Sequence, residues 1–344
     1  MDNNLLQKLP KIELHRHIEG AFHPETLFHI AMKNQLDFPS NFADFKDTLQ
    51  FPKDSKPDFA LFLSKFYNKW YHSLDDVYTV VYNSFLHLDN NEHLFYSEIR
   101  FNPFHFAIHQ GFDPVETLKV FLMATRSAIR TTKQNTKLLM TINRGFYPEE
   151  KYIEIFQQFM KHVDLLDVIG IDLAGDEVNF PPEHFTKFFN LIQSYGYPCT
   201  IHAGEVTSAQ QIWTAIDQLH AKRIGHGVKL IDDFQLINYV KEKNIAFEMC
   251  PISNYQTGAY IDTKTHPIKS LLEQGVQVTL NSDDPTVQNT TLVDDYVACV
   301  DQMGMSLENL HTLNHNAINA SFLSDKEKNL LRHQFNHQWN KTIH

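Results

Sequence analysis

The feature that most constrains the fold of this chain is a regular alternation of short β-rich runs with segments of helical periodicity. The β-rich runs lie at 11–17, 93–101, 137–143, 167–173, 198–202, 223–226, 245–249 and 276–282. Helical spacing of apolar residues occurs between them at 113–134, 150–163, 182–195, 207–219, 231–243 and 266–274. Strands that alternate with helices predict βαβ units and a parallel sheet. Eight such strands predict an α/β protein with a closed (β/α)8 barrel of the TIM type.

Two segments exceed what a minimal barrel needs. Residues 36–92 separate the first two predicted strands and contain aromatic stretches with helical spacing, and the tail from 290 onward has the spacing of two or three helices. The length of 344 residues suits one large barrel, and no repeat or Gly/Ser linker divides the chain. We therefore expect a single domain over 1–344. The insertion at about 36–92 is expected to form a lid-like helical cover over the carboxyl ends of the strands, and the tail to close the far side.

Charge and cysteine content restrict the partners and the compartment. The 41 acidic residues exceed the 30 basic ones and give a formal net charge of −11. This balance disfavours nucleic acid as a partner, because such binding depends on Lys and Arg at phosphates. The three cysteines, Cys199, Cys250 and Cys299, are far apart and form no CxxC pair, which is typical of reduced thiols. No apolar run has signal-peptide or membrane-spanning length. We therefore expect a cytoplasmic protein without membrane contact, and its oligomeric state cannot be inferred.

Unusual polar residues follow four of the predicted strands. They are His15 and His17 at the end of the first strand, His202 at the end of the fifth with Glu205 three residues on, His226 at the end of the sixth, and Asp283 and Asp284 at the end of the eighth. Residues two apart in a strand point to the same side, so the imidazoles of His15 and His17 can both face the barrel mouth. Barrel enzymes place their active sites at the carboxyl ends of the strands. The pattern therefore predicts a shared catalytic site at this end of the barrel.

Three histidines and one carboxylate form a set of nitrogen and oxygen donors that suits zinc. A catalytic zinc keeps one position for water and lowers the pKa of that water to about 7, and Glu205 and His226 are placed to transfer protons. Each motif alone has an ordinary alternative, since a His-x-His pair is often solvent-facing and Asp-Asp-Pro often caps a turn. Their joint appearance, each at a strand end, favours the catalytic interpretation.

The segments PKIELHRHIEGAFHPETL, GIDLAGDE, IHAGE, RIGHG and NSDDP together resemble the adenosine deaminase family of the amidohydrolase superfamily. The resemblance extends from about residue 9 to about residue 330. It implies that one zinc ion per chain is held by His15, His17, His202 and Asp283. It also implies that Glu205 protonates N1 of the purine and that His226 orients the zinc-bound water and takes its proton. The implied substrate-binding residues are His17, Glu19, Gly175 near N3 and Asp284 near N7, and Asp172 is expected to be a structural hydrogen-bonding partner.

The resemblance implies hydrolytic deamination of adenosine, and of 2′-deoxyadenosine, to inosine and ammonia by attack of zinc-bound hydroxide at C6. The partners would be a small purine nucleoside and water. Glu19 departs from the pattern, because many members have Asp where the 5′-hydroxyl binds, and glutamate adds one methylene of roughly 1.5 Å. Adenine, a 5′-modified adenosine or aminodeoxyfutalosine therefore remain alternative substrates. More distant alternatives are a hydrolase of a non-purine amide and a non-catalytic nucleoside-binding relative.

Overall fold

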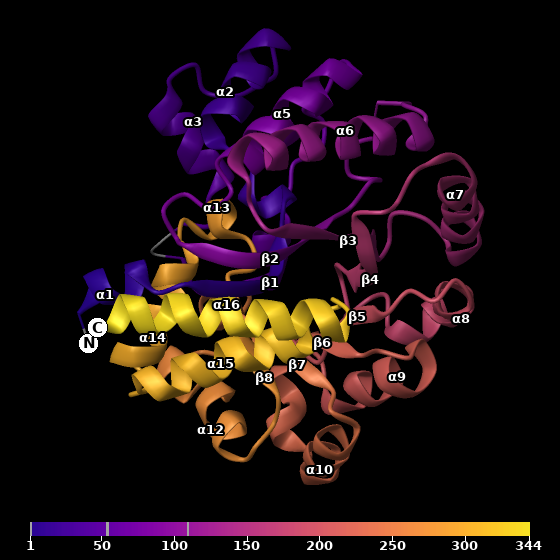
Figure 1. Cartoon of the computed structure of the whole chain (residues 1–344). Helices are drawn as coiled ribbons and strands as arrows, with labels where there is room; N and C mark the ends of the chain where they lie inside the picture. The colour runs from indigo at the N-terminus through magenta and orange to yellow at the C-terminus, as the bar shows by residue number, and fades with distance from the viewer. Residues whose placement is uncertain (1, 53–54, 109) are drawn as a thin grey trace.

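The computed structural model describes residues 2–52, 55–108 and 110–344 of the chain. Within them, parallel strands form a single sheet in the order β1-β2-β3-β4-β5-β6-β7-β8 (Figure 1). The strands are β1 Lys11–His17, β2 Leu94–Phe101, β3 Thr136–Asn143, β4 Val168–Ala174, β5 Cys199–Ala203, β6 Arg223–His226, β7 Ala246–Met249 and β8 Val278–Leu280. Every predicted β-rich run overlaps one of these strands, with boundaries that differ by at most two residues, so the predicted (β/α)8 architecture is confirmed.

The helices alternate with the strands and surround them. They are α1 Asn3–Lys8, α2 Pro24–Lys33, α3 Phe42–Leu49, α4 Phe59–Leu63, α5 Leu74–Leu86, α6 Pro114–Thr132, α7 Glu149–His162, α8 Thr186–Ser194, α9 Ala209–Leu219, α10 Phe234–Lys243, α11 Pro251–Gln256, α12 Ile268–Glu273, α13 Pro285–Gln288, α14 Leu292–Asp301, α15 Leu307–Ala320 and α16 Asp325–Ile343. Each predicted helical interval overlaps a helix. Among the described residues, no helix is both long and apolar enough to cross a membrane.

The sheet meets itself at a short seam between β1 and the residues that follow β8. Arg16 and Asp283 form a parallel bridge there. The amide of His17 donates to the carbonyl of Asp283 at 2.9 Å, and the amide of Asp283 donates to the carbonyl of His15 at 2.8 Å. The seam therefore brings the two ends of the barrel sequence together at the residues that the sequence marks as metal ligands.

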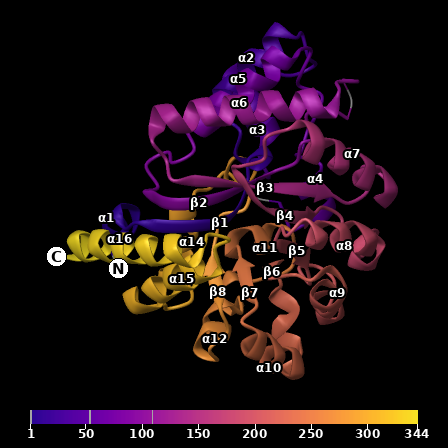
Figure 2. The same ribbon diagram turned by 45° about the vertical axis from the view of Figure 1, so that its right-hand side comes forward.

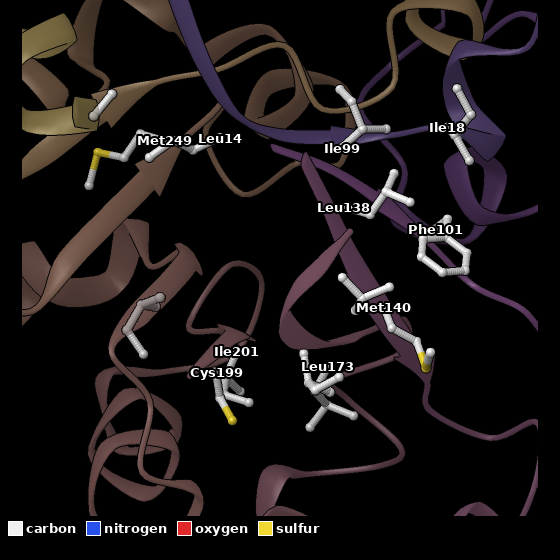
Figure 3. Packing of buried hydrophobic residues seen from close by; sticks show 14 of the residues in the cluster. Leu14, Ile18, Ile99, Phe101, Leu138, Met140, Leu173, Cys199, Ile201 and Met249 are labelled. Carbon is white, nitrogen blue, oxygen red and sulfur yellow. The ribbon is translucent and has the colours of Figure 1, made fainter. Parts of the chain in front are cut away.

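Apolar side chains from all around the barrel pack between the strands and the helices. Figure 3 shows Leu14, Ile99 and Leu138 from β1 to β3 and Leu173 and Ile201 from β4 and β5 within one buried cluster. Helices cover these strands on the outside, so the side chains that point outward are apolar.

The segment predicted to be a lid divides between two places. Helix α5 packs against α6 and α2, and these helices lie together outside β2 and β3 (Figure 2). Helix α4 instead lies at the carboxyl ends of the strands, where Phe59 and Phe62 line a cavity. Residues 53 and 54 of this segment lie outside the described residues.

The tail forms three helices, α14, α15 and α16, in agreement with the two or three predicted. Helix α15 packs against β8 and β1, and α16 packs against α15 and α1. In the loop after α15, the amide of Phe322 donates to Glu98 at 2.8 Å, and its ring lies 3.8 Å from the Arg223 guanidinium. The tail therefore covers the barrel at the start of β6, opposite the strand ends that carry the histidines.

Candidate active site

Four residues predicted to bind a metal converge at the barrel mouth. The Nε2 atoms of His17 and His202 are 3.2 Å apart, and Asp283 Oδ1 lies 3.3 Å from His15 Nε2 and 3.5 Å from His17 Nε2. This Oδ1 atom is buried and accepts no well-directed hydrogen bond from the described residues. Nitrogen atoms this close, beside a buried carboxylate oxygen without a donor, fit the donor set of a zinc ion.

A fourth histidine, His226, lies close enough to these donors to be an alternative ligand. The donor atoms of His15, His202, His226 and Asp283 all lie within 4.8 Å of one another. However, His226 Nε2 is 3.9 Å from Asp283 Oδ2, an oxygen that already accepts a hydrogen bond of 2.6 Å from Ser253. His17 faces the free oxygen, Oδ1, at the shorter distance of 3.5 Å. The geometry therefore favours His17 over His226 as a ligand.

Outer partners orient two of these side chains. Glu248 accepts from His15 Nδ1 at 2.8 Å, and Asp172 from His202 Nδ1 at 3.0 Å. Each bond places the proton on Nδ1 and leaves the Nε2 lone pair facing the centre, as metal-binding histidines require. Asp172 is thus a structural hydrogen-bonding partner, as its motif predicts, whereas the sequence analysis did not identify Glu248.

A buried arginine joins the two outer carboxylates. Arg100 Nη2 donates to Glu248 at 2.7 Å, and its Nη1 lies 3.5 Å from Asp172. Burial raises the pKa of Asp172, but the charges of Arg100 and His202 outweigh it and hold the pKa below its usual range. Burial also raises the pKa of Glu248, but the charges of Arg100 and Arg223 outweigh it, so both outer carboxylates stay ionised. In the sequence, Arg100 and Glu248 could have been noticed as charged residues among the apolar residues of the segments EIRF and AFEM.

Glu205 and His226 face one another beside the metal donors. Glu205 Oε2 lies 3.7 Å from His226 Nε2. Burial, with the charges of Asp283 and Glu177, raises the pKa of Glu205 to about 8, which favours the protonated carboxyl group near neutral pH. Its Oε1 atom accepts from Thr257 Oγ1 at 2.8 Å. A buried carboxylic acid of this kind can act as a general acid.

Two of the strand-end residues have left-handed backbone conformations. His226 has φ of +58° and Asp283 has φ of +66°. Such a conformation costs a side chain of this kind of order 1 kcal/mol or more and is concentrated at functional sites. In both cases the strand ends at or just before the residue, and the turn aims its side chain into the mouth.

Asp284 lies against the first turn after β1. Its Oδ1 atom is buried and has no hydrogen-bond partner among the described residues. Burial and the neighbouring charge of Asp283 raise the pKa of Asp284 well above its usual value. A Cβ atom on Gly20 would lie 1.8 Å from this oxygen. Glycine is therefore required at position 20, which the sequence analysis did not note.

A cavity of about 240 Å³ opens over these groups. The predicted residues His17, Glu19, Gly175, His202, Glu205, His226, Asp283 and Asp284 all line it. Glu19 Oε1 accepts the amide of Asn102 at 2.7 Å, and burial raises the pKa of Glu19 to about 8. Gly175 has φ of +95°, and a Cβ there would lie 3.3 Å from the amide nitrogen of Arg144. Lining residues that the sequence analysis missed include Asn102, His105, Arg144 and Thr257.

A wider hollow of about 810 Å³ lies at the opposite end of the barrel, beside Pro198, Lys222 and Ile245 just before β5, β6 and β7. It contains none of the predicted site residues. The smaller cavity therefore marks the candidate active site, because the strand-end donors, the buried acids and the helix α4 side chains meet there.

The parallel barrel and its strand-end histidines and carboxylates define a metal-dependent hydrolase of the amidohydrolase type. The model of the adenosine deaminase family matches residues 10–338. Adenosine deaminase from Escherichia coli O1:K1 is 32% identical over 326 residues, which cover 94% of this chain and 97% of that protein. The chain belongs to the adenosine deaminase family, hydrolases that act on amidine C–N bonds.

Two solved structures share the fold. The adenine deaminase from Arthrobacter aurescens superposes with a TM-score of 0.86 at 26% identity, covering 97% of this chain and 99% of that one. An Arabidopsis N6-mAMP deaminase superposes with a TM-score of 0.82 at 23% identity, covering 97% and 99%. The proteins similar to this chain are thus named for different substrates: a nucleoside, a base and a nucleotide.

Proposed function

We propose that this protein is a zinc-dependent deaminase that converts adenosine, and 2′-deoxyadenosine, to inosine and ammonia. The observation that carries the proposal is the position of Glu205 and His226. They lie 3.7 Å apart and line one cavity together with His17, His202 and Asp283, whose Oδ1 atom lies 3.3 Å from His15 Nε2. A proton donor, a water-orienting group and a metal donor set within one cavity are the parts that hydrolytic attack on a purine requires.

Zinc is the ion that the donor chemistry favours, because three imidazoles and one carboxylate suit it better than the oxygen-rich sites of magnesium or calcium. When bound, zinc supplies a Lewis acid that lowers the pKa of a water molecule to about 7. His15, His17, His202 and Asp283 would hold it. The unpartnered Asp283 Oδ1 and the outward Nδ1 hydrogen bonds of His15 and His202 support this assignment.

The remaining groups handle the substrate. Water supplies the oxygen that bonds to C6 while the C6–amino bond breaks; one water proton ends on N1 and the other leaves in ammonia. One group has to face both the water and N1, and we assign this role to Glu205, because its Oε2 lies 3.7 Å from His226 Nε2 in the same cavity. Asp284, with an unpartnered Oδ1 and a raised pKa, would donate to N7. Gly175 would contact N3 through its backbone.

The scarcity of cationic groups in the described lining of the cavity favours an uncharged nucleoside over a nucleotide. The described lining contains the carboxyl groups of Glu19, Asp176, Glu205, Asp283 and Asp284. Arg144 supplies the guanidinium of this lining, and its Nη2 is already bonded to the carbonyl of His202 at 2.6 Å. A phosphate carries about −1.5 to −2 charges at neutral pH and needs cationic partners. We therefore propose that this chain, unlike the Arabidopsis N6-mAMP deaminase, does not act on monophosphates.

Adenine is the second candidate substrate, favoured by Glu19 and by the likeness to the Arthrobacter adenine deaminase. Against it, helix α4 contributes Phe59, Phe62 and Leu63 to the lining, beyond the groups that would hold a base. These apolar side chains leave a place for a sugar between the base and α4, where Glu19 would accept a hydrogen bond from one of the sugar hydroxyl groups.

The test follows the ultraviolet absorbance of zinc-quantified enzyme mixed separately with adenosine, adenine and AMP. We expect rapid conversion of adenosine, with kcat/KM at least about 100-fold above either alternative, which corresponds to about 2.7 kcal/mol of discrimination. A preference for adenine would assign the protein to base deamination and would make Glu19 the mark of that specificity. A preference for AMP would overturn the argument from cavity charge.

The role of Glu205 has its own test. Glu205→Gln keeps the size and the hydrogen bonds to Oε1 but removes the transferable proton, so we expect kcat to fall by about 10³-fold while zinc content and thermal stability remain. Glu183→Gln, at an exposed position, is the matched control and should behave as wild type. A Glu205→Gln enzyme with normal turnover would contradict the assignment.

A further inference from the structure

One buried amide touches both proton-handling groups of the site. Asn254, on α11 just after β7, is fully buried. Its Nδ2 atom lies 3.1 Å from His226 Nδ1 and 3.3 Å from Glu205 Oε1, and its Oδ1 atom lies 3.1 Å from His266 Nε2. His266 lies in the loop before α12, Ile268–Glu273, so the hydrogen bonds connect this loop to the active site.

The direction of these hydrogen bonds is determined at the outer end by a backbone group. The amide of Ile268 can only donate, and it lies 3.3 Å from His266 Nδ1. His266 Nδ1 is therefore an acceptor, and burial lowers the pKa of His266 to about 3, so the neutral ring carries its proton on Nε2. This Nε2–H donates to Asn254 Oδ1. The amide of Asn254 is thereby oriented with its NH2 group toward Glu205 and His226.

That orientation determines where the two catalytic groups carry their protons. His226 Nδ1 accepts from Asn254, so the neutral ring has its proton on Nε2, the nitrogen that faces Glu205 and Asp283. Glu205 Oε1 accepts from both Asn254 and Thr257. The proton of the acid then belongs on Oε2, which is the oxygen that faces His226.

We propose that His266 and Asn254 are positioning residues that direct the protons of His226 and Glu205 into the active-site cavity. Through them the amide of Ile268 sets the tautomer of His226 and selects the oxygen of Glu205 that carries the transferable proton. The inference rests on the proposed deaminase function and deepens it. His226 then donates to the attacking water and orients it, but does not take its proton as the family resemblance implied. Glu205, after giving its proton to N1, is the carboxylate that receives one from the water.

Three substitutions separate positioning from packing. Asn254→Asp keeps the shape but replaces the donating NH2 with an acceptor, which would draw the His226 proton to Nδ1. His266→Phe removes the donor that orients Asn254. His266→Gln retains an N–H at the corresponding place. Tyr260→Phe, whose ring packs 5.4 Å from His266, is the matched control for packing.

We expect Asn254→Asp to lower kcat by about 10²-fold or more and His266→Phe by about 10-fold, with KM within about threefold and zinc content unchanged. His266→Gln should recover most of the loss, and Tyr260→Phe should match wild type. A uniform rise in KM, or activity loss that only follows loss of zinc, would overturn the proposal.

A second readout does not depend on turnover. Nitrogen-15 spectra of histidine-labelled, zinc-loaded protein distinguish the Nε2–H from the Nδ1–H tautomer, and His226→Gln identifies the His226 signal. We expect Nε2–H in wild type and Nδ1–H in Asn254→Asp. An Nδ1–H signal for His226 in the wild-type protein would overturn the proposed positioning role of Asn254 and His266, even if the protein is an active deaminase. If the protein shows the Nε2–H signal but is inactive on adenosine, the positioning role of Asn254 and His266 stands and the proposed substrate is rejected.

Discussion

At the scale of single residues, glycine makes room for the metal-binding rings. Gly225 lies in β6 beside two of the proposed ligands, and a Cβ atom there would lie 3.0 Å from His15 Cε1 and 3.1 Å from His202 Cγ. The rings have little freedom to retreat, because Glu248 and Asp172 hold their Nδ1 atoms. The glycine in RIGHG therefore leaves space for two rings of the proposed metal centre, in addition to the His226 that the motif was noted for.

We predict that Gly225→Ala lowers zinc affinity by about 10- to 100-fold, because tilting a ligand ring costs as much as losing its outer partner. Isothermal titration with zinc measures the change. Gly196→Ala is the control: it has φ of +81° and no atom within 4 Å of the new methyl group. This control should lose stability through its backbone but bind zinc normally. Equal zinc affinity in the Gly225→Ala protein would show that the rings can move aside.

At the scale of elements, a buried lysine ties the start of β1 to its surroundings. Lys11 Nζ donates to the carbonyls of Gln7 and Leu9, at 3.0 and 2.8 Å, and of Glu92, at 2.8 Å. These carbonyls belong to the end of α1 and to the loop before β2. The lysine thus joins three segments at the end of β1 remote from His15 and His17, although burial lowers its pKa to about 7.

We predict that Lys11→Met lowers the free energy of unfolding by about 2–4 kcal/mol, since buried carbonyl oxygens lose their donor at about 1–3 kcal/mol each, with partial relaxation. Urea unfolding followed by circular dichroism measures the difference. Lys8→Met, at an exposed position, should change stability by less than about 0.5 kcal/mol. β1 also carries His15 and His17. If Lys11→Met lowers the free energy of unfolding but leaves activity unchanged, the histidine end of β1 still forms correctly.

At the scale of the whole molecule, the barrel interior is charged. Arg223 Nη1 donates to Glu98 at 2.6 Å, and Arg100 Nη2 donates to Glu248 at 2.7 Å. Ion pairs of this kind gain little net stability because desolvation offsets their attraction. Their position beneath His15 and His202 indicates that they orient the ligands, while the apolar layer outside the strands supplies the folding energy.

We predict that zinc removal lowers the melting temperature by about 8 °C. Saturation at 1,000-fold above Kd stabilises by about 4 kcal/mol, and a chain of this size shifts by roughly 2 °C per kcal/mol. Calorimetry before and after chelation measures the shift, and added zinc should restore it whereas calcium should not. An unchanged transition in protein shown to have lost one equivalent of zinc would contradict a metal centre coupled to the folded barrel.

Much of the fold and the core of the site could be predicted from local pattern. Period and composition predicted the strands, and His15, His17, His202 and Asp283 stood out because polar residues ended apolar runs. Asn254 and His266 could not be assigned in this way. Each looks like an ordinary loop or helix-capping residue, and only the packing of α11 and the loop before α12 brings them within 3.1 Å of each other.

What the sequence by itself determined is the alternation of strands and helices, since apolar periodicity is a local property that burial turns into secondary structure. It also placed the reactive side chains at strand ends, which a parallel barrel gathers at one mouth. Only the tertiary structure decided which atoms meet: His17 at the free oxygen of Asp283, α4 rather than α5 over the cavity, and Asn254 between Glu205 and His226. Hydrogen bonds depend on distance and direction to within a few tenths of an ångström, and chain order carries no such information.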